Sequence, residues 1–156
     1  MQGRWIAKLA AGLALALALA VAGYHQFGTA PAAAGEIAVW KSPSCGCCGK
    51  WVEHLRANGF RVVVHETDDL APVKQSQGVP QNLQSCHTAE VDGYTIEGHV
   101  PAAEVKRLLA ERPKARGLAV AGMPLGSPGM EQGSAREAYD VMLFDDQRRQ
   151  SVWRRY

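Results

Sequence analysis

The alternation of apolar and polar residues predicts a mixed α/β domain that begins near residue 36. Residues 36–41 alternate apolar with small or polar side chains, and residues 60–65 are β-branched and apolar, so both stretches are expected to be strands. Between them, apolar residues recur at helical spacing up to Asn58-Gly59, a common helix stop, which predicts a helix over residues 47–58. The domain is therefore expected to begin with a strand, a helix and a second strand.

The pattern continues with a helix, a hairpin and another helix. Residues 68–77 show a weaker helical pattern that ends at a Gly-Val-Pro sequence. Residues 88–91 and 94–97 are strand-like and flank Asp92-Gly93, the strongest short signal for a two-residue hairpin turn. Residues 102–111 follow a proline at the helix start and place their apolar residues on one face.

The resulting order, β-α-β-α-β-β-α, is that of the thioredoxin-like fold, which we assign to residues 35–115. A stretch rich in glycine and proline follows, and then one more expected strand at 139–144. Residues 116–146 are thus expected to be a C-terminal extension that packs back onto the domain and its site. The last ten residues, 147–156, carry four arginines and are expected to be a charged, flexible tail.

The first 34 residues have the layout of a secretory signal peptide. Arg4 and Lys8 precede a run of leucine, alanine and valine, and Ala32-Ala33-Ala34 suits cleavage before Gly35. The alternative is an uncleaved inner-membrane anchor, although the run is short for a span of about 20 residues. Two of the 17 Lys and Arg residues lie in this segment, so the others balance the 15 Asp and Glu residues. Nucleic-acid binding is not expected, and membrane contact is expected only through this segment.

The four cysteines, Cys45, Cys47, Cys48 and Cys86, are the candidate chemistry of the chain. Three of them lie at the start of the predicted helix, where the helix dipole and free N–H groups lower thiol pKa values and favour thiolate. Thiolate attacks disulfides and also ligates soft metals such as Cu(I), zinc or iron–sulfur clusters. A pair of structural disulfides is the alternative, but adjacent Cys47 and Cys48 would then need Cys45 and Cys86 as separate partners.

The number of thiols favours a metal site over a redox dithiol, because a dithiol does not need a third sulfur. Zinc sites usually combine two separated pairs of ligands, and this chain has one such pair. In a thioredoxin-like fold the segment entering the third strand lies beside the start of the first helix. Cys86 and His87 are therefore expected to face the other cysteines, and His99, on the turn before the last helix, is a further candidate ligand.

Two methionines are also candidate ligands. Met123 and Met130 lie in a Gly/Pro-rich loop without a periodicity that would bury them, so they could ligate Cu(I) from a loop that covers the site, with core packing as the rival interpretation. His54 lies about 10 Å along the helix from Cys47, too far for a shared metal ion. His65 ends a predicted strand and is expected to be structural or exposed.

Five motifs carry a resemblance that spans the chain from about residue 37 to residue 144. They are Trp40-Lys-Ser-Pro-Ser-Cys45-Gly-Cys-Cys48-Gly-Lys-Trp51, Leu83-Gln-Ser-Cys86-His-Thr-Ala89, Gly93-Tyr94, Glu97-Gly-His-Val-Pro101 and Gly122-Met-Pro-Leu-Gly-Ser-Pro-Gly-Met130. Together they resemble the CopG-like periplasmic copper-binding proteins. The resemblance implies a periplasmic protein of Gram-negative copper resistance, with a thioredoxin-like domain whose extension contributes to a multinuclear copper cluster bridged by cysteines. The matching positions are Cys45, Cys47, Cys48 and Cys86, with His87, His99, Met123 and Met130 as further ligands.

Three functions are therefore open. The first, which the resemblance implies, is a monomeric copper-binding protein that interconverts Cu(I) and Cu(II) and works with a periplasmic copper efflux system. The second is a thiol–disulfide oxidoreductase in which Cys45 attacks and Cys48 resolves; Cys47 and Cys86 have no part in that mechanism. The third is a passive chaperone that hands copper to an efflux partner without redox turnover.

Overall fold

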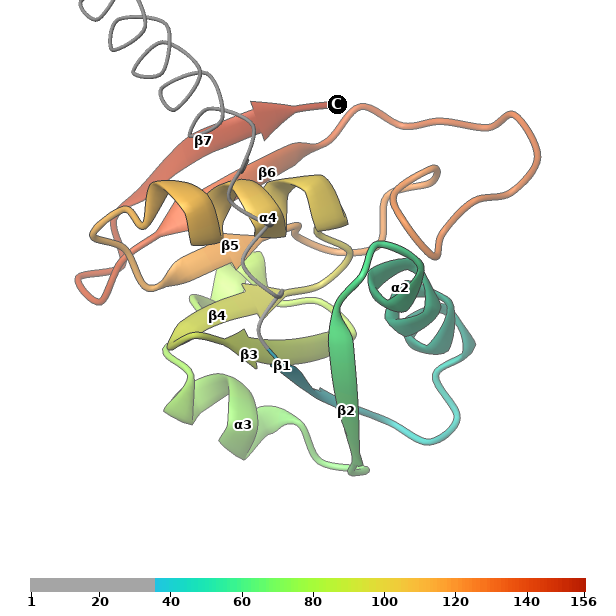
Figure 1. Ribbon diagram of the computed structural model, residues 1–156, viewed down its shortest axis with the longest axis horizontal. Helices are drawn as coiled ribbons and strands as arrows, with labels where there is room; N and C mark the ends of the chain where they lie inside the picture. Colours follow the sequence, from blue (N-terminus) through green and yellow to red (C-terminus); the bar gives the residue numbers. More distant parts are fainter. Residues whose placement is uncertain (1–35) are drawn as a thin grey trace, which may run out of the picture. The chain divides into compact units, whose positions relative to one another are not determined.

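The structure is a computed structural model that describes residues 36–156, and these residues form a seven-stranded mixed sheet with helices packed on it (Figure 1). The expected signal peptide, residues 1–34, lies outside the described residues. Within residues 36–156 no helix combines the length and the apolar character needed to cross a membrane.

The helices and strands follow the predicted order. The strands are β1 (Glu36–Lys41), β2 (Arg61–Glu66), β3 (His87–Val91), β4 (Tyr94–Glu97), β5 (Gly117–Ala119), β6 (Asp140–Phe144) and β7 (Gln150–Arg155). The helices are α2 (Gly46–Ala57), α3 (Ala71–Ser76) and α4 (Ala102–Glu111), with a short 3-10 turn, η1 (Gln81–Leu83).

The strand order in the sheet is β2-β1-β3-β4-β5-β6-β7. β1 and β2 are parallel and are joined through α2, whereas β3 runs antiparallel to β1 and β4 antiparallel to β3. β5 then pairs parallel with β4 after the α4 crossover, and β6 and β7 continue the sheet as antiparallel strands. The predicted mixed α/β class is confirmed, and β5, only three residues long, is an addition that the apolar pattern did not predict.

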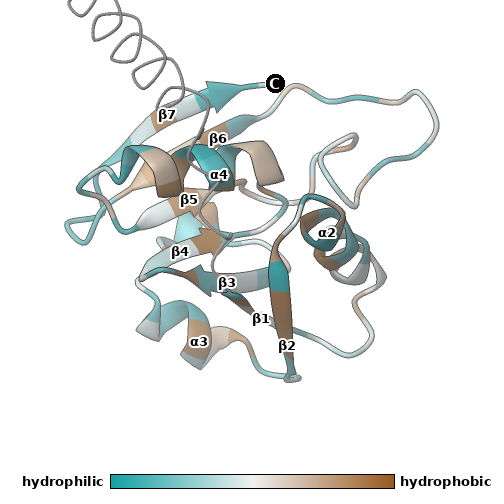
Figure 2. Ribbon diagram, viewed as in Figure 1, coloured by the Kyte–Doolittle hydropathy of each residue, from teal (hydrophilic) through white to brown (hydrophobic). Residues whose placement is uncertain are grey.

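The hydrophobic core lies where α2 and α4 cover one face of the sheet. Side chains that are fully excluded from solvent come from both helices and from the inward positions of β1 and β4; they include Ile37, Val39, Trp51, Leu55, Ile96, Val105 and Leu108. Burying such side chains contributes about 1.5–3 kcal/mol each. In Figure 2 hydrophobic colour is strong on β1 and β2, whereas β7 at the edge is largely hydrophilic.

A buried polar network lies on the other face of the sheet, under α3. The Lys74 ammonium group is 2.5 Å from Glu97 Oε1 and donates to Thr88 Oγ1 at 3.0 Å. The Thr88 hydroxyl in turn donates to Glu97 Oε2 at 2.7 Å. Side chains alternate between the two faces of a strand, so Thr88 and Glu97 point away from the apolar core, toward α3. The network joins α3 to β3 and β4 directly behind the segment that carries Cys86.

The C-terminal residues correct one expectation, because the predicted flexible tail over 147–156 contains an ordered strand, β7. Asp145 fixes the turn before it by accepting from the backbone N–H groups of Gln147 and Arg149. Trp153 and Tyr156 then donate from Nε1 and the hydroxyl group to the Glu104 carboxylate of α4, both at 2.8 Å. The four arginines suggested a solvated tail, but the two aromatic side chains supply long-range contacts that composition does not reveal.

Replacing Glu104 with alanine should release β7 from α4. Each of the two hydrogen bonds reaches a charged acceptor, so we expect a loss of about 2–4 kcal/mol in unfolding free energy. Urea denaturation measures this loss, and amide hydrogen exchange should show faster exchange over residues 150–155. Glu111→Ala is the control, because its exposed ion pair with Arg107 is worth at most about 0.5 kcal/mol. Equal effects of the two variants would contradict a stabilising role for the hydrogen bonds from Trp153 and Tyr156 to Glu104.

Candidate metal centre

The turn between β1 and α2 places three thiol positions at the start of the helix. Pro43 occupies the second position of a turn closed by the Cys45 N–H bond to Ser42 O at 3.1 Å, a position that proline favours. Cys45 is the N-cap of α2, and Cys47 and Cys48 lie in its first turn. Cys45 and Cys48 are joined by a disulfide, whereas Cys47 and Cys86 are free. The two structural disulfides considered from the sequence are therefore replaced by one.

Cys86 lies against this turn although it is remote in sequence. It follows η1 and directly precedes β3, which pairs with β1 and so meets the start of α2. The Cys47 and Cys86 sulfurs are 4.0 Å apart, and the Cys47 and Cys45 sulfurs are 3.5 Å apart. The structure thus brings all four cysteine sulfurs together, with the ligand atoms within 4.8 Å of one another.

Two buried imidazoles extend the sulfur cluster on the Cys86 side. The Cys86 sulfur is 3.1 Å from His99 Nε2 and 3.3 Å from His87 Nδ1, and both rings are fully buried. His99 Nδ1 is 2.8 Å from the Pro128 carbonyl oxygen. A carbonyl only accepts, so Nδ1 carries the proton and Nε2 presents its lone pair toward Cys86. This is the arrangement in which histidine usually ligates a metal.

Burial sets the protonation of these groups. It lowers the pKa of His99 and lowers that of His87 well below its usual range, so both rings are neutral at pH 7 and able to ligate. Burial, reinforced by the Cys47 thiol, raises the pKa of Cys86 to about 12, so the metal-free side chain is a protonated thiol. Among the buried side-chain nitrogen and oxygen atoms of residues 36–156, His87 Nε2 is the one without a hydrogen-bond partner.

Trp51 forms the inner wall of the centre. Its ring lies 4.3 Å from the His87 ring, measured between centroids, and its Nε1 donates to Val100 O at 2.9 Å. The indole therefore fixes both β3 and the turn that carries His99. The sequence placed Trp51 in the predicted helix and in the first motif, but it did not indicate this contact with His87.

The Gly/Pro-rich loop lies directly on the start of α2. Pro128 and Gly129 are buried, and Gly129 has a φ of +88°. A Cβ at Gly129 would lie 2.7 Å from Cys47 O and 2.9 Å from Trp51 N, so the two backbones touch. Met130 next to it is half-buried, whereas Met123 is 52% exposed. The structure thus places Met130 beside the buried part of the loop and Met123 on the surface.

The two other histidines within residues 36–156 have structural roles. His54 Nε2 accepts the Ala102 N–H at 3.0 Å and so satisfies a free donor at the start of α4. His65 stacks on Trp40, with ring centroids 5.2 Å apart. Neither belongs to the potential ligand groups found in the described part of the chain.

Glu97 is a residue of the site that sequence analysis missed. Its Oε1 accepts the Ser85 N–H at 2.6 Å, immediately before Cys86. The N–H of the next residue, Gly98, donates to His87 O at 3.1 Å, immediately after Cys86. Burial raises the pKa of Glu97, although Lys74 opposes the shift. The sequence carries no local signal for this role, because the strand Tyr-Thr-Ile-Glu does not show that its last residue is buried.

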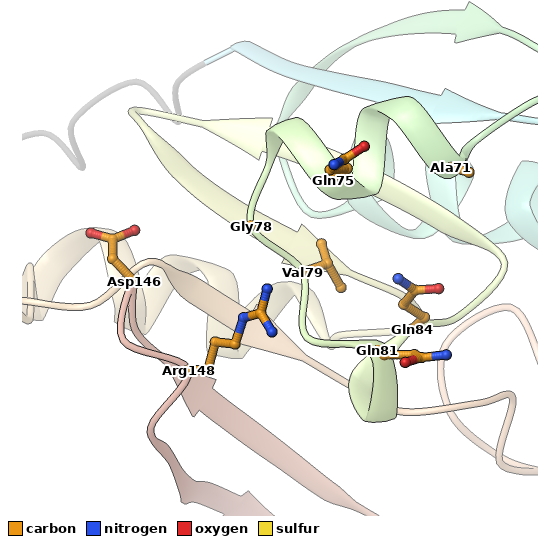
Figure 3. Close-up of a pocket in the computed structure, with 8 residues that line it drawn as sticks. All are labelled: Ala71, Gln75, Gly78, Val79, Gln81, Gln84, Asp146 and Arg148. Carbon is orange, nitrogen blue, oxygen red and sulfur yellow. The ribbon is translucent and has the colours of Figure 1, made fainter.

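A separate pocket of about 450 Å³ lies between α3 and the β6–β7 turn (Figure 3). It is lined by Ala71, Gln75, Gly78, Val79, Gln81, Gln84, Asp146 and Arg148. None of these residues carries a soft or imidazole donor, so this pocket is not the metal centre.

Comparisons with known proteins agree with the motifs. Residues 83–130 match the family model described as "Protein of unknown function, DUF411". Two solved structures titled "Copper resistance protein copG", Form 1 and Form 2, are each 46% identical to this chain, with TM-scores of 0.75 and 0.76. Each alignment covers 79% of this chain and 98% of the solved chain. The comparison with curated proteins found no match.

Proposed function

The chain belongs to the DUF411 family that contains copper resistance protein CopG, and on that premise we propose that it binds copper in a thiolate-bridged cluster as part of copper resistance. The observation that carries the proposal is the meeting of Cys45, Cys47, Cys48 and Cys86 with the two buried imidazoles. Thiolate prefers Cu(I), and imidazole suits copper in either oxidation state.

The donor set fits copper as cargo. Cys86 belongs to both potential ligand groups, one of four thiols and one that adds His87 and His99. The His99 tautomer presents Nε2 toward the Cys86 sulfur, and His87 presents Nδ1 toward the same atom, so both rings agree with imidazole ligation. Opening the Cys45–Cys48 disulfide would be required before all four sulfurs can ligate, so only the reduced chain offers the complete donor set. Met130 and Met123 are proposed as outer thioether ligands.

We also propose that residues 35–115 are thioredoxin-like and that residues 116–146 are an extension belonging to the metal site. The strand order β2-β1-β3-β4, with β1 and β2 parallel and the next two strands antiparallel, supports the first part. The contacts of Pro128 and Gly129 with His99 and α2 support the second. The chain is proposed to act as a monomer in the periplasm, to interconvert Cu(I) and Cu(II), and to pass copper to an efflux system.

The test of the proposed cluster is copper analysis of the reduced chain beside a Cys47→Ser variant. We expect more than one copper ion per unmodified chain and a loss of at least one ion in the variant, because Cys47 lies between two other sulfurs. Ser44→Ala, next to the cluster on the exposed surface, is the control and should retain the full amount. Less than one ion per chain, together with an unaffected Cys47→Ser variant, would contradict the proposal.

Copper binding should strengthen with pH. A thiol must lose its proton to ligate, and burial raises the pKa of Cys86 to about 12, so Cu(I) must displace that proton near neutral pH. Each displaced proton makes the apparent affinity rise about tenfold per pH unit. Competition titrations against a Cu(I) chelator between pH 7 and 9 measure the slope. Cys86→Ser should lower the slope by about one proton, and an unchanged slope would count against Cys86 as a ligand.

The Cys45–Cys48 disulfide at a helix start favours one second candidate, a thiol–disulfide oxidoreductase. An oxidoreductase of this kind would reduce insulin, and the activity would require Cys45 and Cys48 but would not change when Cys86 is replaced. A passive chaperone, the remaining alternative, would bind and transfer copper without any change in its oxidation state. A copper-oxidation rate and a reduction potential separate it from the redox proposal.

A further inference from the structure

We propose that Cys45 and Cys48, as a dithiol, supply the electrons that reduce two Cu(II) ions to Cu(I), and that the Cys45–Cys48 disulfide is the spent form of the chain. This inference rests on the proposed copper site and assigns the source of its electrons. It differs from the thiol–disulfide function, because the oxidant is the copper cargo and not another disulfide.

The four cysteine sulfurs fall into two pairs, one bonded and one free. Cys45 and Cys48 form the bond, with Cα atoms 5.4 Å apart, a distance at which a disulfide closes without movement of the backbone. Cys47 and Cys86 stay free, and Cys86 keeps both imidazole neighbours, at 3.1 and 3.3 Å. Oxidation of the first pair therefore leaves a set of soft and imidazole donors that can hold the Cu(I) product.

The second support is the contact between the two sets. The Cys47 sulfur lies 3.5 Å from the Cys45 sulfur and 4.0 Å from the Cys86 sulfur. These are contact distances between sulfur atoms, so electrons reach the Cys86 side without crossing solvent or backbone. A redox dithiol in which the residues between the two cysteines lack sulfur would have no such connection.

The step is balanced within the chain and its cargo. The thiols of Cys45 and Cys48 each lose one electron and one proton, and the bond forms between their sulfurs. Each of two Cu(II) ions gains one electron, and the two protons pass to solvent. One chain thus reduces two copper ions and then stops.

Resetting needs a dithiol reductant from outside, and the structure indicates which sulfur that reductant attacks. The Cys48 side chain is fully buried, whereas Cys45 is partly exposed. The external thiolate therefore attacks Cys45 and forms a mixed disulfide, and Cys48 leaves as a thiolate at the positive end of α2. The second thiol of the reductant then releases Cys45, and the reductant departs as a disulfide.

The experiment mixes the fully reduced chain, freed of small reductants under argon, with Cu(II) and a chromophoric Cu(I) chelator. We expect two Cu(I) ions per chain and one new disulfide, located by alkylation and peptide mass spectrometry between Cys45 and Cys48. The chain that already carries this disulfide should form no Cu(I). Cys48→Ser should slow the initial rate of Cu(I) formation about tenfold or more, because the partner thiol is missing.

Cys47→Ser tests the sulfur contact between the two sets. It should still form the Cys45–Cys48 disulfide, but more slowly than the unmodified chain, and it should hold less copper after desalting. Cu(I) formation with a different disulfide, or an unchanged rate in Cys48→Ser, overturns the inference. Direct loading with Cu(I) in parallel separates this inference from the proposed function. If the chain retains more than one Cu(I) ion but does not reduce Cu(II), only this inference is overturned. If it retains less than one ion, the proposed function is overturned.

Discussion

Replacing Glu97 with alanine is expected to lower the free energy of unfolding by about 3–5 kcal/mol, because it leaves the Lys74 ammonium group buried without its partner. The same change removes the acceptor of the Ser85 N–H, so the residue before Cys86 loses its anchor. Copper stoichiometry should fall together with stability. Urea denaturation and metal analysis of the reduced chain measure the two effects.

A double variant separates charge from position. Glu97→Leu combined with Lys74→Met removes both charges and keeps apolar volume, so most of the lost stability should return. Copper stoichiometry should stay low in the double variant, because leucine cannot accept the Ser85 N–H. Full recovery of copper binding would show that the carboxylate matters only through its charge pair.

Replacing Gly129 with alanine is expected to lower the unfolding free energy by about 2–4 kcal/mol and to push the loop away from α2. The new Cβ would lie 2.7 Å from Cys47 O, a distance that side chains do not tolerate, at a residue with a φ of +88°. His99 would then lose the fixed position of the Pro128 carbonyl next to Gly129. Denaturation, together with copper retention after desalting, measures the result.

Gly59 provides the matched control, because it has the same φ of +88° and open space around its Cα. Gly59→Ala should therefore show only the backbone strain, about 1 kcal/mol, with no change in copper retention. Equal losses in the two variants would mean that the contact between the loop and α2 contributes nothing.

The order of helices and strands could be predicted because short-range patterns determine it. Helix α2 spans 46–57 where spacing predicted 47–58, and the Asp92-Gly93 turn joins β3 and β4 as expected. β7 escaped prediction, because its order depends on Trp153 and Tyr156 reaching Glu104 across some 50 positions. Local patterns carry no information about such contacts.

The metal centre also has features that the sequence could predict and features that it could not. Strand topology implied that Cys86 would lie near the start of α2, and the structure has it 4.0 Å from Cys47. The pairing of His99 with Pro128 depends on the path of a loop without periodicity, so no pattern could supply it. The role of Glu97 depends on a partner in α3 and a backbone group before β3. The ligand roles themselves remain predictions.

The sharing of Cys86 between the two ligand groups has a consequence for how the chain fills with copper. The proton on this sulfur is held tightly, so the first ion must displace it at a cost in binding free energy. A second ion then meets a bridging thiolate that is already deprotonated, and it binds more tightly. Filling is therefore expected to show positive cooperativity, with empty and fully loaded chains outnumbering those that carry a single ion.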